Sequence, residues 1–412
     1  MEKRSRVGVV AAVLLFLLAA TFFLWEMTRP GWGCDFRLRY NELTCLRAGV
    51  DPFLVWSGKT NLPGLQPYTE ASGAHLIEAK AHPFVHTYTP WTYSLLYPLS
   101  RLDYPVALAC WRLVLTLCFA LLSTFAYRCA RGVRDEPGDG MFALAAVSLF
   151  LALNFENAIA LNFGLLLALT VCAMGRLLNR GHDLAAGLCL AVLMMKPQIG
   201  TLFTFPLLLH RKFKTLAFGA ALCLAGTVPT ALFCRRSPLA LIVQVFQAGV
   251  YTQRTTFFPR RVYTFLVQHS TAAVPFVTSA LLGAALCAWL CWRLRRERDW
   301  LLQLAAPAIV CVAWTYSMAH DRLVLALPVI LVSCALCGER EEKTRTLLFA
   351  LLFFLPLDVA YQYCCWLIPD VPAPVIRASF LWRSAHNLLS LFLLAGFCLW
   401  YSRNSSRKEA VA

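Results

Sequence analysis

The chain has 412 residues, of which 59% are apolar and 15% charged, and its formal net charge is +16. A mean hydropathy of +0.61 excludes a water-soluble globular protein, which would need far more charge to cover its surface. Apolar runs of span length recur along the chain, and this pattern predicts an all-α polytopic membrane protein. Because the basic residues fall in short clusters between these runs, no nucleic-acid partner is expected.

The first apolar run, 7–25, is long for a signal peptide, and no small-x-small cleavage site follows it. We therefore expect it to stay in the protein as the first helix. At ~20 apolar residues per crossing, the sequence predicts about twelve spans. Their expected ranges are 7–25, 105–127, 141–153, 158–176, 184–195, 198–210, 215–233, 273–292, 300–318, 321–337, 346–364 and 386–402. Three of them (141–153, 184–195 and 198–210) are too short to cross alone and read as helices broken near one face.

The charge clusters predict the orientation of the spans. The segments "KRSR", "RCARGVR", "RLLNR", "HRKFK", "RLRRER", "REEKTR" and "RNSSRK" alternate along the chain with much longer loops. Basic clusters mark the cytoplasmic side, so both termini are expected inside. The outer face then carries loops 26–104, 234–272 and 365–385. No repeat or separate soluble segment is evident, which predicts a single membrane domain over 1–412.

Polar residues that border the apolar runs gather on this predicted outer face. They are Asp35 after the first span, Asn157 in "NFENA", Lys196 in "LMMKPQIG", Arg260 and Arg261 in "FFPRRVY", and His320 and Asp321 in "YSMAHDRL". An ionisable group at membrane depth costs ~2.5–3.5 kcal/mol on insertion scales, so such groups usually have a function. Their presence on one face is the main functional signal of the sequence.

Each of these residues also has a purely structural interpretation. Asp35 can form a surface ion pair with Arg37 or Arg39, and Lys196 can extend to the membrane interface while Pro197 only breaks the helix. Arg260 and Arg261 can anchor lipid headgroups. Cys34 and Cys45 share a loop and are able to form a disulfide, although independent thiols are the simpler interpretation.

The sequence holds no G-x-S-x-G, H-E-x-x-H or Walker-type loop, and no segment has room for a nucleotide-binding α/β domain. His75, His82 and His86 match no standard ligand spacing. We therefore expect neither a metal nor another cofactor.

Four stretches together resemble glycosyltransferase family 87. They are "DFRLRYNELTCLRAGVDPF" (35–53), "YTPWTYSLLYPLSRL" (88–102), "GHDLAAGLCLAVLMMKPQIGTLFTFPLLLHRKFK" (181–214) and "WTYSMAHDRLVLALP" (314–328). The chain departs from the family at one point, where it has "NFEN" instead of the frequent Gly-Gln-x-Asn. Only the final asparagine of that motif, Asn157, is retained. The resemblance implies a GT-C fold, a donor sugar on polyprenyl phosphate (mannose as first choice, for the cell envelope), a lipid or glycan acceptor and no nucleotide. It also implies inversion at the anomeric carbon without an obligatory metal.

This chemistry assigns roles to the residues above. An inverting transfer needs one carboxylate to accept the proton of the acceptor hydroxyl, and Asp35 is the expected base. The phosphate leaving group needs cations, and Lys196, Arg260, Arg261 and the second catalytic candidate, His320, are expected to supply them. Tyr88, Asn157, Asp321 and Arg37 complete the expected substrate site. The active site is thus expected on the outer face of the inner (plasma) membrane, in contact with membrane lipids.

Two other classes of protein remain open at this stage. A transporter or flippase for lipid-linked sugars would also need aromatic and basic residues at membrane depth, although transporters usually show paired half-repeats and groups near the midplane. A purely structural membrane subunit leaves the one-sided polar cluster unexplained.

Overall fold

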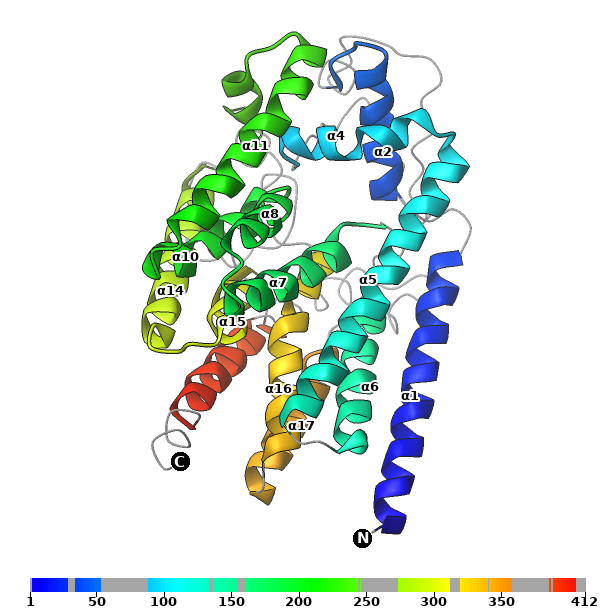
Figure 1. The fold of residues 1–412 in the computed structure, drawn as a ribbon, viewed down its shortest axis with the longest axis vertical. Helices are drawn as coiled ribbons and strands as arrows, with labels where there is room; N and C mark the ends of the chain where they lie inside the picture. The colour runs from blue at the N-terminus through cyan, green and yellow to red at the C-terminus, as the bar shows by residue number, and fades with distance from the viewer. Residues whose placement is uncertain are drawn as a thin grey trace, which may run out of the picture.

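The computed structural model describes residues 2–28, 34–52, 88–133, 136–154, 161–243, 245, 273–311, 319–339, 341–357, 385–386 and 388–404. All regular structure in these ranges is helical, which confirms the predicted all-α class for the described part of the chain. The long helices form a bundle, and both chain termini lie at its lower end in Figure 1. The short helices α2 and α4 lie at the opposite end.

The helices begin with α1 (Glu2–Thr28), α2 (Cys34–Arg47), α4 (Pro90–Leu96), η1 (Tyr97–Arg101), α5 (Tyr104–Val133), α6 (Pro137–Leu153) and α7 (Gly164–Asn179). The middle of the chain forms α8 (Asp183–Leu193), α9 (Pro197–Gly200), η3 (Thr201–Phe203), α10 (Thr204–Leu209) and α11 (Phe213–Cys234). The last part forms α14 (Ala273–Leu294), α15 (Trp300–Cys311), η4 (Ala319–Leu325), α16 (Ala326–Gly338) and α17 (Glu342–Phe354), followed by an apolar helix at Leu388–Asn404. Every predicted span overlaps at least one of these helices.

Among the described residues, four helical stretches are long and apolar enough to cross a membrane. They are Val7–Thr28, Tyr104–Val133, Phe213–Cys234 and Asp321–Gly338, and several shorter apolar helices accompany them. The total of about twelve spans stays a prediction, because the shorter apolar helices are not long enough to be identified as spans by their length alone.

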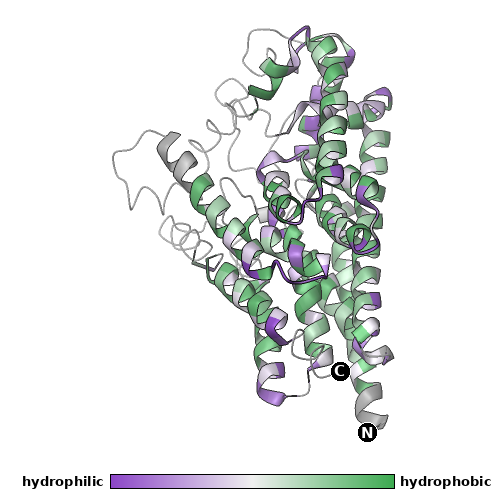
Figure 2. Ribbon diagram, turned by 60° about the vertical axis from the view of Figure 1, so that its left-hand side comes forward, coloured by the Kyte–Doolittle hydropathy of each residue, from purple (hydrophilic) through white to green (hydrophobic). Residues whose placement is uncertain are grey.

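Side chains on the long helices face either the bundle or its surroundings. On α5, Leu115 and Leu122 are fully buried, whereas Leu117 on another face is 52% exposed. On α1, Val7 and Leu14 are more than 60% exposed. Figure 2 shows apolar residues along the lengths of these helices. Exposed apolar surface of this extent is stable in lipid rather than in water, and the protein is therefore embedded in a membrane.

The packing of the helices connects the bundle to the upper end of the molecule. Helix α6 packs against both α1 and α5, and α16 packs against α5 and α6. Helix α11 packs along α8 and reaches α4 (Figure 1). Helix α11 thus connects α4 to the bundle, and the 3-10 helix η1 connects α4 to α2.

The predicted break around Lys196 is confirmed. Helix α8 ends at Leu193 and α9 begins at Pro197, so Lys196 lies between them with an extended backbone. Proline suits the first turn of a helix because the N–H groups of that turn have no acceptor within the helix, so no hydrogen bond is lost. Gly200 then folds back on the end of α8, where a Cβ would lie 2.6 Å from the Met194 nitrogen. The absence of a side chain at Gly200 thus lets the backbone of α9 pack directly against the end of α8.

Candidate functional site

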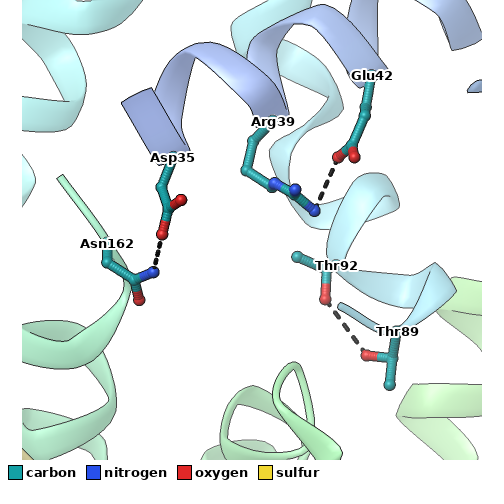
Figure 3. A network of polar contacts seen from close by, with 6 residues as sticks. All are labelled: Asp35, Arg39, Glu42, Thr89, Thr92 and Asn162. Atoms are coloured by element: carbon teal, nitrogen blue, oxygen red, sulfur yellow. Dashed lines mark hydrogen bonds and ion pairs between the residues drawn. The ribbon is translucent and has the colours of Figure 1, made fainter. Parts of the chain in front are cut away.

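Asp35 lies in the first turn of α2, where the helix dipole favours a negative charge. Its Oδ2 accepts a hydrogen bond from Nδ2 of Asn162, which lies just before α7 (Figure 3). Asn162 is 4% exposed, and Asp35 is half-buried. The carboxylate is therefore held by a neutral donor, the amide of Asn162.

Arg39 lies one helical turn after Asp35 on α2, and Glu42 lies two turns after it. They form a buried ion pair of 2.9 Å, which Figure 3 shows on the same side of α2 as Asp35. Burial raises the pKa of Glu42 to about 7, while the charge of Arg39 and a hydrogen bond from Tyr93 oppose this rise. The expected ion pair between Asp35 and Arg37 or Arg39 is absent from the described contacts. Arg39 pairs with Glu42 instead, and Nε of Arg37 donates to the Tyr104 hydroxyl at 3.3 Å.

The Tyr88 ring lies between two cations. The guanidinium carbon of Arg39 is 4.6 Å from the ring centroid, and Nζ of Lys196 is 5.4 Å from it. Burial raises the pKa of Tyr88 well above its ordinary value, and the nearby charges of Asp35 and Asp321 add to this effect, against that of Arg39. Tyr88 is therefore a neutral phenol, and it lies within electrostatic reach of both carboxylates.

Lys196 and Asp321 form the second charged pair of the site. Their Nζ and Oδ1 atoms are 2.7 Å apart, and the side chains are 3% and 1% exposed. A lysine at the membrane interface would instead keep its ammonium in water, so the structure rules out that interpretation of Lys196. In the described part of the chain, Asp321 accepts one of the three N–H bonds of the ammonium, and the Tyr88 ring lies 5.4 Å from Nζ.

Thr89, which follows Tyr88, forms hydrogen bonds with the segment between α8 and α9. Its backbone N–H donates to the Met195 carbonyl at 3.2 Å, and its hydroxyl lies 3.1 Å from the Met194 carbonyl. The hydroxyl is also 3.3 Å from that of Thr92 (Figure 3). These bonds fix Tyr88 relative to Lys196.

A third group of contacts holds η4, the helix that carries Asp321. Nη2 of Arg322 lies 2.8 Å from Nδ1 of His386, and Nε2 of His386 lies 2.8 Å from the Phe354 carbonyl. The carbonyl only accepts, so Nε2 carries the proton and Nδ1 accepts from Arg322. The segment after Asp321 is thus tied to α17 and to the C-terminal part of the chain.

Of the residues selected from the sequence, the structure brings four together: Asp35, Tyr88, Lys196 and Asp321. Arg37 points to Tyr104 on α5 rather than to Asp35. Arg260, Arg261 and Asn157 lie outside the described residues, as does the side chain of His320, whose backbone is part of η4.

Sequence reasoning missed Asn162 and Glu42, and it considered Arg39 only as a surface ion-pair partner of Asp35. Asn162 is the last polar residue before an apolar helix, the same signal that selected Lys196 and Asp321. The spacing of Arg39 and Glu42 by three residues on a helix was also a readable sign of a pair. Cys45 is a buried free thiol, as the simpler interpretation predicts, and the side chain of Cys34 lies outside the described residues.

The arrangement has the parts of a group-transfer site. A carboxylate accepts protons, and a buried ammonium stabilises a developing negative charge. Both groups lie within electrostatic reach of one neutral phenol, Tyr88. In the described residues, these side chains come from α2, the segment before α4, the break after α8, and η4.

Comparison with known families identifies the chain. The model of glycosyltransferase family 87 matches residues 86–318, which include Tyr88, Asn162 and Lys196 but neither Asp35 nor Asp321. No curated protein and no solved structure shows a significant match. The matched region covers more than half of the chain, and this membrane-embedded helical protein therefore belongs to glycosyltransferase family 87.

Proposed function

We propose that the protein transfers a sugar, with mannose as first choice, from a polyprenyl-phosphate carrier to an acceptor at the outer face of the inner membrane. The observation that carries this proposal is the joint position of Asp35 and the Lys196–Asp321 pair around Tyr88. A base and a cation close to each other are what an inverting transfer from a phosphate requires.

In the proposed reaction, Asp35 accepts the proton of the acceptor hydroxyl. The hydroxyl oxygen forms a bond to the anomeric carbon from the face opposite the leaving group, and the anomeric carbon–oxygen bond to phosphate breaks. Its electron pair leaves with the polyprenyl phosphate, where Lys196 donates hydrogen bonds to the oxygens. Asp321 keeps the ammonium oriented. Arg260, Arg261 and His320 are proposed as further phosphate contacts, and Asn157 and Arg37 as substrate contacts.

A lipid-linked donor is favoured over a nucleotide sugar by the architecture. The described part of the chain is entirely helical and contains no α/β domain that would bind a nucleotide. Helix α2, which carries Asp35, and helix α4, which follows Tyr88, lie at the end of the bundle away from the two termini (Figure 1), and the termini are proposed to be cytoplasmic. A GT-C architecture, in which such a site opens to the outer leaflet, is part of the proposal.

The test is a transfer assay with purified protein in lipid nanodiscs. It compares polyprenyl-phosphate mannose, glucose and arabinofuranose with the matching nucleotide sugars and measures release of polyprenyl phosphate. We expect release from one lipid-linked donor, and we expect NMR to show a product whose anomeric configuration is opposite to that of the donor. Transfer from a nucleotide sugar without any lipid carrier would overturn the proposal, as would retention of configuration.

The alternative of a flippase is tested in proteoliposomes. A flippase would move a labelled lipid-linked sugar from one leaflet to the other without breaking its glycosyl bond. The proposed enzyme breaks that bond and leaves the leaflet of the unreacted donor unchanged.

A further inference from the structure

We propose that Asn162 and Trp111 are positioning residues that hold the Asp35 carboxylate in its reactive orientation. The inference rests on the proposed role of Asp35 as the base. Asn162 donates from Nδ2 to one carboxylate oxygen of a residue 127 positions away in the sequence. Asp35 has no second hydrogen bond to the described residues, so its other oxygen is left for the acceptor hydroxyl.

The choice of an amide as the partner has a chemical reason. An arginine or lysine at this place would neutralise Asp35 and weaken it as a base, because an opposite charge favours the ionised form. A neutral amide fixes the direction of the carboxylate with a smaller effect on its proton affinity. Asn162 thus orients the base without pairing its charge.

The backbone before Asn162 is strained. Leu161 has φ +48°, in the left-handed region that bulky side chains rarely adopt, and it is 1% exposed. Such a conformation costs conformational free energy and persists only where the surroundings enforce it. Here the indole Nε1 of Trp111 donates to the Leu161 carbonyl at 2.7 Å. This bond holds the peptide that aims Asn162 at Asp35.

Trp111 also packs against the immediate neighbours of both partners. Its ring stacks on Phe36, which follows Asp35, with centroids 5.8 Å apart and planes 12° apart. It also contacts Phe163, which follows Asn162, at 4.8 Å. Trp111 is 4% exposed and lies in the long helix α5. A single rigid side chain therefore sets the distance between the two segments that carry Asp35 and Asn162.

The arrangement extends to the cationic half of the site. Phe163 packs on the Tyr88 ring with centroids 5.0 Å apart, and Lys196 lies over the same ring. A displacement at Trp111 is thus transmitted first to the base and only through two further rings to the phosphate-binding side. For this reason we expect variants of Trp111 to affect turnover more than donor binding.

The first test uses Asn162→Ala and Asn162→Asp. Asn162→Ala should lower kcat roughly ten- to a hundredfold, with the KM for the donor nearly unchanged, because a misplaced catalytic group costs rate rather than affinity. Asn162→Asp should also shift the acidic limb of the pH–rate profile to higher pH, since two adjacent carboxylates disfavour each other's ionisation. Among the described residues, the other ionisable groups that act on the Asp35 site are Arg39, Glu42 and Tyr88, which stay unchanged in both variants.

The second test uses Trp111→Phe, which keeps a packed ring but removes the N–H donor. The matched control is Trp91→Phe, because Nε1 of Trp91 also donates to a backbone carbonyl, that of Ala191, at 3.2 Å. Trp111→Phe should lower kcat by about tenfold, the value of one lost hydrogen bond, and Trp91→Phe should not. A purely structural role predicts that both variants lose thermal stability and that neither changes kcat per folded molecule.

The outcomes separate this inference from the proposed function. Suppose that Asp35→Asn abolishes transfer, but Asn162→Ala keeps full turnover or Asn162→Asp leaves the pH–rate profile unchanged. The positioning role of Asn162 is then wrong, and the assignment of Asp35 as the base is unaffected. If Asp35→Asn itself keeps its turnover, the proposed function fails. In the Asp35→Asn background, Asn162→Ala should lower the residual rate no further.

Discussion

Lys196 and Asp321 are 125 residues apart in the sequence, and their side chains meet in a buried ion pair of 2.7 Å. Breaking such a pair by removing one partner typically costs about 3–5 kcal/mol, because the other charge stays buried. Loss of activity after a single substitution is therefore ambiguous. Lys196→Ala alone can unfold the protein as well as weaken donor binding.

A double variant resolves this ambiguity. Lys196→Gln combined with Asp321→Asn replaces the ion pair with two neutral groups that can still form a hydrogen bond. We expect this variant to fold, to bind the lipid-linked donor roughly ten- to a hundredfold more weakly and to turn over more slowly, since the loss of a charge-assisted contact costs ~1.5–3 kcal/mol. Donor titration in nanodiscs and thermal unfolding are measured together. Unchanged donor affinity in a folded double variant would assign the pair to stability alone.

Asp35→Asn tests the base directly. Asparagine keeps the size of the side chain but cannot accept the proton of the acceptor, so turnover should fall by 10²–10⁴-fold while donor binding is retained. Asp51→Asn is the control, since Asp51 pairs with Nε of Arg236 at 2.7 Å and is expected to affect stability rather than chemistry. An Asp35→Asn protein that keeps more than about a tenth of the normal turnover would contradict the assignment.

Glu42 should make the stability of the protein depend on pH. Its pKa is about 7 in the folded protein against an ordinary value of 4.5, so the folded state holds a proton that the unfolded state releases. The free energy of unfolding should therefore decrease as the pH rises from about 4.5 to about 7, and this group should add no further change above that. Thermal unfolding between pH 5 and pH 8 should show the decrease, and Glu42→Gln should remove this part of it. The exposed Glu136→Gln serves as the control and should leave it in place.

Gly200→Ala should damage the site through the backbone. A Cβ at Gly200 would lie 2.6–2.7 Å from backbone atoms of Leu193 and Met194, which cannot move aside as a flexible side chain would. Overpacking of this kind typically costs about 1–3 kcal/mol, and here it would also shift Lys196. We expect a lower unfolding temperature and weaker donor binding. Gly396→Ala, where a Cβ meets open space, should show neither change.

The proposed orientation is tested by cysteine labelling from the two sides of the membrane. Asp103→Cys should react with an impermeant thiol reagent added outside intact cells, and Lys343→Cys should react only after the inner side is opened. Both positions are exposed on the protein, and labelling is compared with that of the native cysteines alone. Reaction of both positions from the same side would refute the assignment of the site to the outer face.

The sequence by itself determined the membrane class, the apolar helical runs and the break before Pro197, whereas α2 forms inside a segment that the sequence predicted as an outer loop. These features are local, because hydropathy over some twenty residues and the missing N–H of proline act within a single helix. It also selected Asp35, Tyr88, Lys196 and Asp321, since a polar residue beside an apolar run is visible without knowledge of its partner.

Only the tertiary structure decided which residues pair with which. From the sequence, Arg37 and Arg39 were the nearest partners for Asp35, yet the carboxylate binds Asn162, which follows it by 127 residues. Lys196 likewise reaches Asp321 across 125 residues. A buried polar group takes the partner that helix packing brings within hydrogen-bond distance, and that packing depends on the shapes of all the apolar faces together. For the same reason the strained Leu161 and its bond to Trp111 leave no local signal, because they exist only where α5 and the start of α7 meet.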